Sequence, residues 1–163
     1  MNDTNAHLVE SYFTGGDRLA AVVKGWSDSD LRRLPSASAP ADVGKWSAHQ
    51  IVIHLQDAEV SFADRLRRVI AMEEPMLLKW DENAFTRRLY YEDHSSADAK
   101  AIILLTRLQT GRVLRKLSDT DFERIGIHSE RGPQKLSDII HFADWHLNHH
   151  LAFIEKKRAA FKI

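Results

Sequence analysis

The sequence of 163 residues contains no cysteine, and this absence excludes three kinds of chemistry. Disulfide bonds, zinc–thiolate sites and cysteine nucleophiles all require the thiol group. A chain without cysteine is consistent with a reducing compartment. The first residues, MNDTNAHLVESYF, lack a basic region followed by an apolar run, so we expect no signal peptide. We therefore predict a cytoplasmic protein.

The sequence also lacks an excess of either charge, since Lys and Arg number 23 and Asp and Glu number 23. A protein that binds nucleic acid through the phosphates normally carries a basic excess. No apolar run approaches the roughly 20 residues that a helix needs to cross a bilayer. We therefore expect neither a nucleic-acid partner nor a membrane partner. A Gly-rich phosphate loop and a Ser-His-Asp signature are also absent.

What the sequence does contain is a helical repeat of apolar residues. With 44% hydrophobic and 28% charged residues, the chain has the composition of one globular domain, which we assign to residues 1–163. Four long amphipathic segments predict an all-α four-helix bundle; they cover about residues 6–24, 46–72, 97–117 and 136–160. The connection 73–96 is longer than a tight antiparallel turn. It can therefore form a crossover that leaves the second and third helices parallel.

The second predicted helix has the clearest signals. Ser47 and Gln50 have the spacing of a capping box at its start. Its apolar residues recur at steps of three and four, and His54 lies at the edge of their line; they are Ile51, Leu55, Ala58, Phe62, Leu66 and Val69. The helix should end before Pro75.

The other segments are less regular. Gly15 and Gly16 weaken the first helix by up to about 1 kcal/mol each relative to alanine. The third helix is expected to bury one of two isoleucines and several further apolar residues, namely Ile102 or Ile103, Leu105, Leu108, Val113 and Leu117. We also expect a short helix near 83–90 and a brief extended piece at 124–128.

Histidine is the most informative residue type. Four of the nine histidines fall within ten residues, namely His141, His146, His149 and His150. Positions 146 and 150 are four residues apart, so a helix places both imidazoles on one face, where they can hold one divalent metal ion. A third ligand from a neighbouring helix would leave an open position for water, and His54 is the best candidate.

Several alternatives remain beside this metal site. The zincin motif needs Glu directly after its first His, and Leu147 stands there, so that protease class is excluded. The spacing of His146 and His150 also occurs by chance in structural helices. His149 is a rival ligand or a rim residue, and His141 is expected to point outward. The histidines expected at the surface or in loops are His7, His49, His94 and His128.

For a few further residues, a functional role and a structural role are both consistent with the sequence. Asp57 can orient a ligand imidazole or act as a general base, or it can simply form an ion pair. Glu59 is expected to be structural, and Trp80 can line a pocket. Asp81 and Glu82 can reach the site, although a solvated loop explains them equally well. Arg65 or Arg68 can bind a phosphate or the carboxylate of a thiol cofactor.

Two blocks of this sequence resemble the DinB-like (YfiT-like) superfamily. The first, KWSAHQIVIHLQDAEVSFADRL, carries the pattern Trp-Ser followed by His-Leu-x-Asp-x-Glu; the second, GPQKLSDIIHFADWHLNHHLAFI, ends in His-x-x-His-His. The segment 107–124 also fits, so the resemblance spans most of 45–154. It implies a four-helix bundle with metal ligands His54, His146 and His150, and zinc or nickel as the metal. It further implies either thiol-dependent S-transfer and isomerisation with a low-molecular-weight thiol, or metal-dependent hydrolysis.

The sequence therefore predicts a metal-dependent enzyme whose three-histidine site activates a water molecule or a low-molecular-weight thiol for reaction with a small-molecule substrate. The alternative is a non-catalytic bundle, in which the histidines are structural or bind metal for stability alone. A stress-related module that works as a homodimer is a third reading, because bundles of this size often form dimers.

Overall fold

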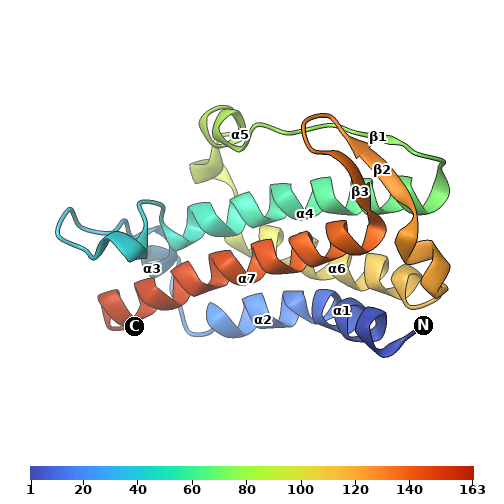
Figure 1. The fold of residues 1–163 in the computed structure, drawn as a ribbon. Helices are drawn as coiled ribbons and strands as arrows, with labels where there is room; N and C mark the ends of the chain where they lie inside the picture. The colour runs from blue at the N-terminus through green and yellow to red at the C-terminus, as the bar shows by residue number, and fades with distance from the viewer.

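Four helical segments lie side by side along the length of the molecule, and the computed structural model describes all residues 1–163 (Figure 1). The α-helices are α1 (Asp3–Phe13), α2 (Gly15–Val22), α3 (Asp28–Arg32), α4 (Ala48–Ala71), α5 (Glu82–Arg88), α6 (Ser96–Leu114) and α7 (Leu136–Phe161). The other elements are the strands β1 (Met76–Leu77), β2 (Ile125–His128) and β3 (Gly132–Lys135), and the 3-10 turns η1 (Ala41–Val43), η2 (Tyr91–Asp93) and η3 (Asp119–Glu123). The predicted four-helix bundle is confirmed, with α1 and α2 sharing one of its four positions. No helix is both long and apolar enough to cross a membrane.

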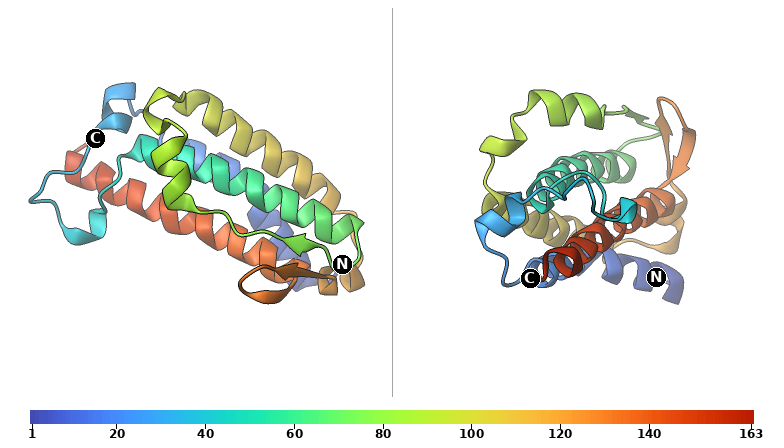
Figure 2. Two further views of the ribbon diagram at one scale, coloured as in Figure 1. Left: turned by 90° about the horizontal axis from the view of Figure 1, so that it is seen from above. Right: turned by 90° about the vertical axis from the view of Figure 1, so that its left-hand side faces the viewer.

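The helices α4 and α6 run in the same direction, while α1, α2 and α7 run in the opposite direction (Figures 1 and 2). One contact joins the starts of the two parallel helices: Nδ1 of His49 in the first turn of α4 lies 2.6 Å from the Ser96 hydroxyl at the start of α6. The connection between them, which carries β1, α5 and η2, returns along the outside of the bundle. The predicted crossover is therefore confirmed.

The helix α4 is central and begins as predicted. The Ser47 hydroxyl accepts from the backbone N–H of Gln50, whose side chain accepts from the N–H of Ser47. All six residues of its predicted apolar line are buried. They divide between two apolar clusters, one reaching Leu55 and the other beginning at Ala58. His54 lies where the two clusters meet.

The first helix differs from the prediction, because it is broken at Thr14 into α1 and α2. The two glycines after the break are buried, since other helices approach their backbone closely. A Cβ atom on Gly15 would lie 2.1 Å from Nη1 of Arg107, and one on Gly16 would lie 2.8 Å from Cδ1 of Leu104. These glycines therefore permit packing that alanine would block.

The prediction for the third helix was wrong in its inward face. Ile103 is buried as expected, but Leu105 is 59% exposed and Val113 is 43% exposed. The inward face of α6 instead carries Arg107 and Thr110, which are both almost fully buried. A pattern of apolar residues cannot reveal a face that buries a guanidinium group. The predicted inward face therefore differs from the observed one by a rotation about the helix axis.

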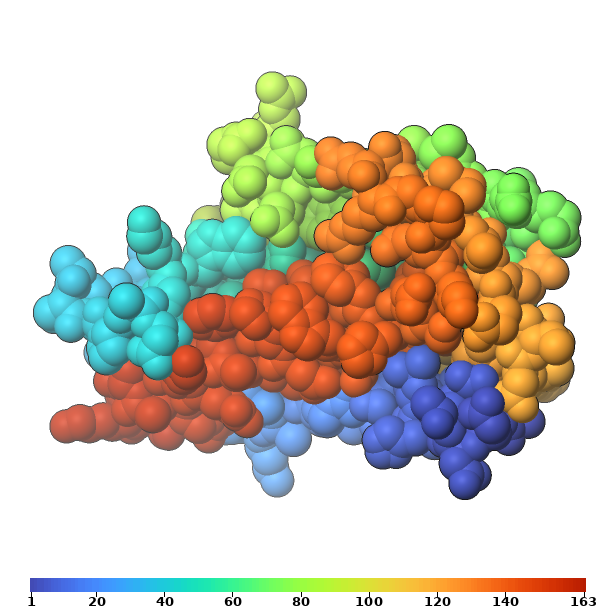
Figure 3. Space-filling view, in the orientation of Figure 1, coloured from blue at the N-terminus to red at the C-terminus, as the bar shows by residue number.

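A small sheet closes one side of the bundle near the start of α7 (Figure 1). Strand β1 pairs in parallel with β2, with Met76 opposite Ile127, and β2 pairs antiparallel with β3. The extended piece expected at 124–128 is β2, whereas β3 had no apolar alternation to indicate it. The hairpin of β2 and β3 stands beside the segment that leads to α5 (Figure 3).

Candidate metal centre

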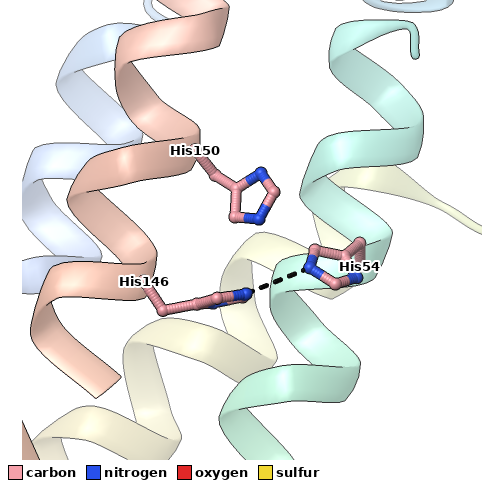
Figure 4. Close-up of side chains that lie close together, drawn as sticks. All are labelled: His54, His146 and His150. Carbon is pink, nitrogen blue, oxygen red and sulfur yellow. Dashed lines mark hydrogen bonds between the residues drawn. The ribbon is translucent and has the colours of Figure 1, made fainter. Parts of the chain in front are cut away.

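Three imidazoles from two neighbouring helices meet inside the bundle (Figure 4). His54 projects from α4, and His146 and His150 project from successive turns of α7. One ligand nitrogen from each ring lies within 4.8 Å of the others. The structure thus brings together the three histidines that the sequence singled out.

The spacing of the rings suits a common cation. The Nε2 atoms of His54 and His146 lie 3.2 Å apart. A tetrahedral zinc ion with Zn–N distances of about 2.0–2.1 Å would separate two ligand nitrogens by about 3.3 Å. The ring of His150 completes the group, with its centroid 4.7 Å from that of His54 and 4.6 Å from that of His146. The donor set therefore fits a divalent ion that prefers imidazole.

Burial keeps these rings neutral, which is the form that binds a metal. Desolvation lowers the pKa of His54 to about 4. Desolvation, and then the neighbouring His54, lowers the pKa of His146 to about 3. Desolvation, and then the neighbouring His146, lowers the pKa of His150 to about 2. At neutral pH all three rings therefore offer lone pairs, and protons compete for them only in acid.

Two of the rings contain a buried nitrogen that lacks a hydrogen-bond partner, namely Nδ1 of His54 and Nδ1 of His150. A polar atom buried without a partner is costly, and native proteins keep few of them. In a packed structural histidine, both ring nitrogens are usually satisfied. Nε2 of His54 faces the ring of His146, so the unpartnered Nδ1 of His54 lies on the other side of its ring, and the case for a ligand site rests on the meeting of the three rings.

Aromatic side chains surround the cluster. The Trp46 ring meets His54 edge-on at 5.1 Å between centroids, and the Trp80 ring stacks on His54 at 5.5 Å. Phe62 meets the His146 ring at 5.7 Å. These walls hold the imidazoles in place and exclude water from one side, so a bound ion would sit in a site of low polarity.

The remaining histidines lie outside this cluster. His141 is exposed, as predicted, and His149 is exposed with its ring stacked on Trp145 at 5.0 Å. The surface location predicted for His49 was wrong. Its ring is fully buried, with Nδ1 2.6 Å from the Ser96 hydroxyl and Nε2 2.8 Å from the carbonyl oxygen of Tyr91. His128 was also expected at the surface or in a loop, yet it lies in β2 and is only 5% exposed.

The carboxyl group of Asp57 pairs with a tyrosine. Its Oδ2 accepts a hydrogen bond of 2.7 Å from the Tyr91 hydroxyl, and burial raises the pKa of Asp57. The contact joins α4 to η2 and thereby anchors the end of the crossover. Asp57 therefore has a structural contact, and its suggested role as a general base stays a prediction.

A buried ion pair joins α6 to α4. Nε of Arg107 donates to Oε2 of Glu59 at 2.7 Å, and both side chains are at most 3% exposed. The other two guanidinium nitrogens donate to the carbonyl oxygens of Tyr12 and Ala143, each at 3.0 Å. One guanidinium thus joins four helical segments and fixes α7 beside α4. The sequence indicated a structural Glu59, but nothing marked Arg107 as its partner.

Two cavities reach the histidine cluster from different sides. The larger, of about 530 Å³, is lined by His146, by residues 79–83 before and within α5, and by residues of the β2–β3 hairpin. The smaller, of about 250 Å³, is lined by His150, Trp46 and Lys157. Trp80 lines the larger one, as the sequence suggested, and so do Asp81 and Glu82. The centre is thus accessible to small molecules.

Comparisons with known proteins agree with this picture. A family model described as the DinB superfamily matches residues 14–154. A relative from Oceanobacillus iheyensis, named "Putative metal-dependent hydrolase", is 32% identical over 111 residues, which cover 68% of this chain and 64% of that protein. The protein of the same description named YfiT, from Bacillus subtilis, is 28% identical over 141 residues, covering 84% of this chain and 74% of its own. The solved structure of YfiT matches this chain with a TM-score of 0.86 and 21% sequence identity, over 99% of this chain and 90% of that chain. YfiT is described as a probable metal-dependent hydrolase with an unusual four-helix bundle topology.

Proposed function

The chain belongs to the DinB superfamily, and from this membership and its histidine cluster we propose that it is a metal-dependent enzyme. His54, His146 and His150 would hold one divalent ion, and zinc or nickel suits a ligand set of imidazoles. A divalent ion held in this way supplies Lewis acidity, which makes a water molecule or a thiol a strong nucleophile at neutral pH. The observation that carries the proposal is the meeting of three neutral imidazoles, two of them with Nε2 atoms 3.2 Å apart, at the end of a cavity.

Hydrolysis is the reaction that the relatives' names support. In that reaction, the cavity beside His146 would take the substrate. Transfer of a low-molecular-weight thiol to an electrophile is the second candidate, and a separate observation favours it. The second cavity reaches the cluster from the side of His150, so two small molecules could approach the centre from different directions.

An activity screen separates these reactions. Metal-loaded protein is assayed with a panel of esters and amides, and with electrophiles in the presence of several cellular thiols. Activity that disappears in His146→Ala and persists in His141→Ala supports the proposal, because His141 is an exposed histidine on the same helix. Thiol dependence selects transfer, and turnover without thiol selects hydrolysis. Activity that is equal in both variants would contradict the proposal.

Two further parts of the proposal concern the protein in the cell. We place it in the cytoplasm with a small-molecule substrate. The homodimer stays a prediction, which the mass of the protein in solution tests. Neither point affects the role of the histidines.

A further inference from the structure

The cavity beside His146 gathers hydrogen-bond donors that lack acceptors. Arg65 of α4 lines it and is only 7% exposed. Its Nη2 donates to the carbonyl oxygen of Leu78 at 2.7 Å, but its Nε is buried without a partner. No carboxylate pairs with this guanidinium, whereas buried charges in proteins are normally paired. Arg65 is thus a buried cation without a carboxylate partner, and its side chain lines the cavity.

A histidine of the hairpin adds a second donor. Nδ1 of His128 accepts from the backbone N–H groups of Glu130 and Arg131, at 3.2 and 3.3 Å. The neutral ring must therefore carry its proton on Nε2, which has no partner within the protein. His128 lines the same cavity, so the turn between β2 and β3 fixes this ring as a donor.

Arg131 supplies a second cation. Its guanidinium carbon lies 4.7 Å above the centroid of the Phe142 ring, and it forms no ion pair. Burial lowers the pKa of Arg65, with the charge of Arg131 as the next cause. Both side chains line the same cavity. Like charges that line one cavity without an ion-pair partner are destabilising, and such arrangements are typical of binding sites.

The carboxylates that line the cavity, Asp81, Glu82 and Glu130, form no ion pair with Arg65 or Arg131. Glu130 binds Lys79 at 2.8 Å, and Asp81 accepts from two backbone N–H groups at the start of α5, each at 3.0 Å. Glu82 is exposed in the first turn of α5, where the helix dipole favours a negative charge. The two unpaired guanidinium groups and the imidazole donor therefore remain for a ligand.

We propose that Arg65, His128 and Arg131 form a subsite for the anionic group of the substrate, a carboxylate or a phosphate. The assignment rests on the proposed function, because the subsite shares its cavity with His146. Phe62, Trp80 and Phe142 also line the cavity, whose volume of about 530 Å³ suits a small molecule. The substrate class is thus a small molecule with an apolar or aromatic body and an anionic group, which the subsite holds while the body reaches the histidines.

Binding of simple probes to metal-free protein tests the subsite apart from catalysis. The probes are benzoate and phenylphosphate, with benzamide as a neutral analogue of benzoate, and calorimetry measures their affinity. We expect both anions to bind and benzamide to bind at least tenfold more weakly. Arg131→Gln and Arg65→Gln should each weaken anion binding by about tenfold, because each removes a charge-assisted hydrogen bond. Arg67→Gln removes the same charge from an exposed position of α4 and should leave binding unchanged.

The outcomes separate this inference from the proposed function. The tighter of the two anions identifies the group that the subsite prefers. Equal binding of benzamide overturns the subsite. Full anion binding in Arg131→Gln, a change at an exposed position, also overturns it. If the anions bind only to metal-loaded protein, and this binding is lost in His146→Ala, the subsite is also overturned. The proposed metal centre is then still supported. Anion binding that depends on these arginines in a protein unable to take up metal supports the subsite and removes the proposed function.

Discussion

The Nε2 atoms of His54 and His146 lie 3.2 Å apart, although 92 residues separate them in the sequence. Both rings are held neutral by burial, so at least one of the two nitrogens presents a lone pair to the other ring. A cation held between the three rings would accept these lone pairs, and the expected effect of metal on stability follows from that interpretation.

Metal should stabilise the fold. A ligand that binds only the folded state at 100 times its dissociation constant contributes about 2.7 kcal/mol, which raises the Tm of a chain of this size by roughly 5–10 °C. Scanning calorimetry of chelator-treated protein, with and without added zinc or nickel, measures the shift. His150→Ala should abolish the shift and His141→Ala should preserve it. An identical shift in both variants would mean that the metal binds elsewhere.

The stability of the metal-free protein should fall in mild acid. In the unfolded chain, histidine takes up a proton below about pH 6.5, whereas in the folded protein the pKa values are about 4, 3 and 2 for His54, His146 and His150. Between pH 6.5 and 4 the unfolded state therefore binds more protons. The stabilising contribution is complete above pH 6.5 and is lost as pH falls, by up to about 1.4 kcal/mol per group per pH unit.

Urea unfolding between pH 7 and pH 4.5 measures this dependence. His146→Gln should reduce the slope by about one proton, since it removes one buried titrating ring. His141→Gln, at an exposed position, is the matched control and should leave the slope as it is. A slope that does not change in His146→Gln would show that other groups control acid unfolding.

Removing Arg107 should destabilise the bundle strongly. The change Arg107→Ala leaves Glu59 as a buried charge without a partner, which typically costs about 3–5 kcal/mol. Replacing both residues together, as Arg107→Met with Glu59→Leu, should cost less than Arg107→Ala, because no charge stays buried alone. Urea unfolding at pH 7 compares the variants with Arg112→Ala, an exposed arginine of the same helix. A loss similar to that of Arg112→Ala would contradict the role of the ion pair.

Alanine at position 15 should destabilise the protein, although helix propensity alone favours alanine over glycine by about 1 kcal/mol. The new methyl group would lie 2.1 Å from Nη1 of Arg107 and 2.7 Å from Cδ2 of Leu147. Overpacking of this kind costs about 1–3 kcal/mol, and the guanidinium cannot move away without losing its buried bonds. The measurement is the midpoint of urea unfolding. A midpoint above that of the wild type would disprove the close packing.

The parts of the fold that the sequence revealed are those with short-range signals. The capping box at Ser47 and the apolar line of α4 depend on residues within one helix, and the helical period made His146 and His150 neighbours. His54 could be added because it lies beside an apolar line. The family resemblance assigned the three histidines to one site, and in the structure their rings lie together.

The features of the fold that could not be predicted from the sequence depend on contacts between segments that are far apart in the chain. The Arg107 side chain can be buried because Glu59 and two backbone carbonyl groups accept its hydrogen bonds. None of these acceptors is near Arg107 in the sequence. The close packing at Gly15 depends on the same guanidinium, because Arg107 occupies the space beside this glycine. The burial of His49 likewise depends on Ser96 and Tyr91, which the crossover brings to it.

The most direct test of the metal centre is elemental analysis of protein that was expressed without a histidine tag, beside the double variant His146→Ala/His150→Ala. The account predicts close to one zinc or nickel ion per chain in the wild type and almost none in the double variant. His141→Ala, analysed in parallel, should retain the metal. Absence of metal from the wild type, even after incubation with zinc and with nickel, would contradict the account and identify the three imidazoles as core packing.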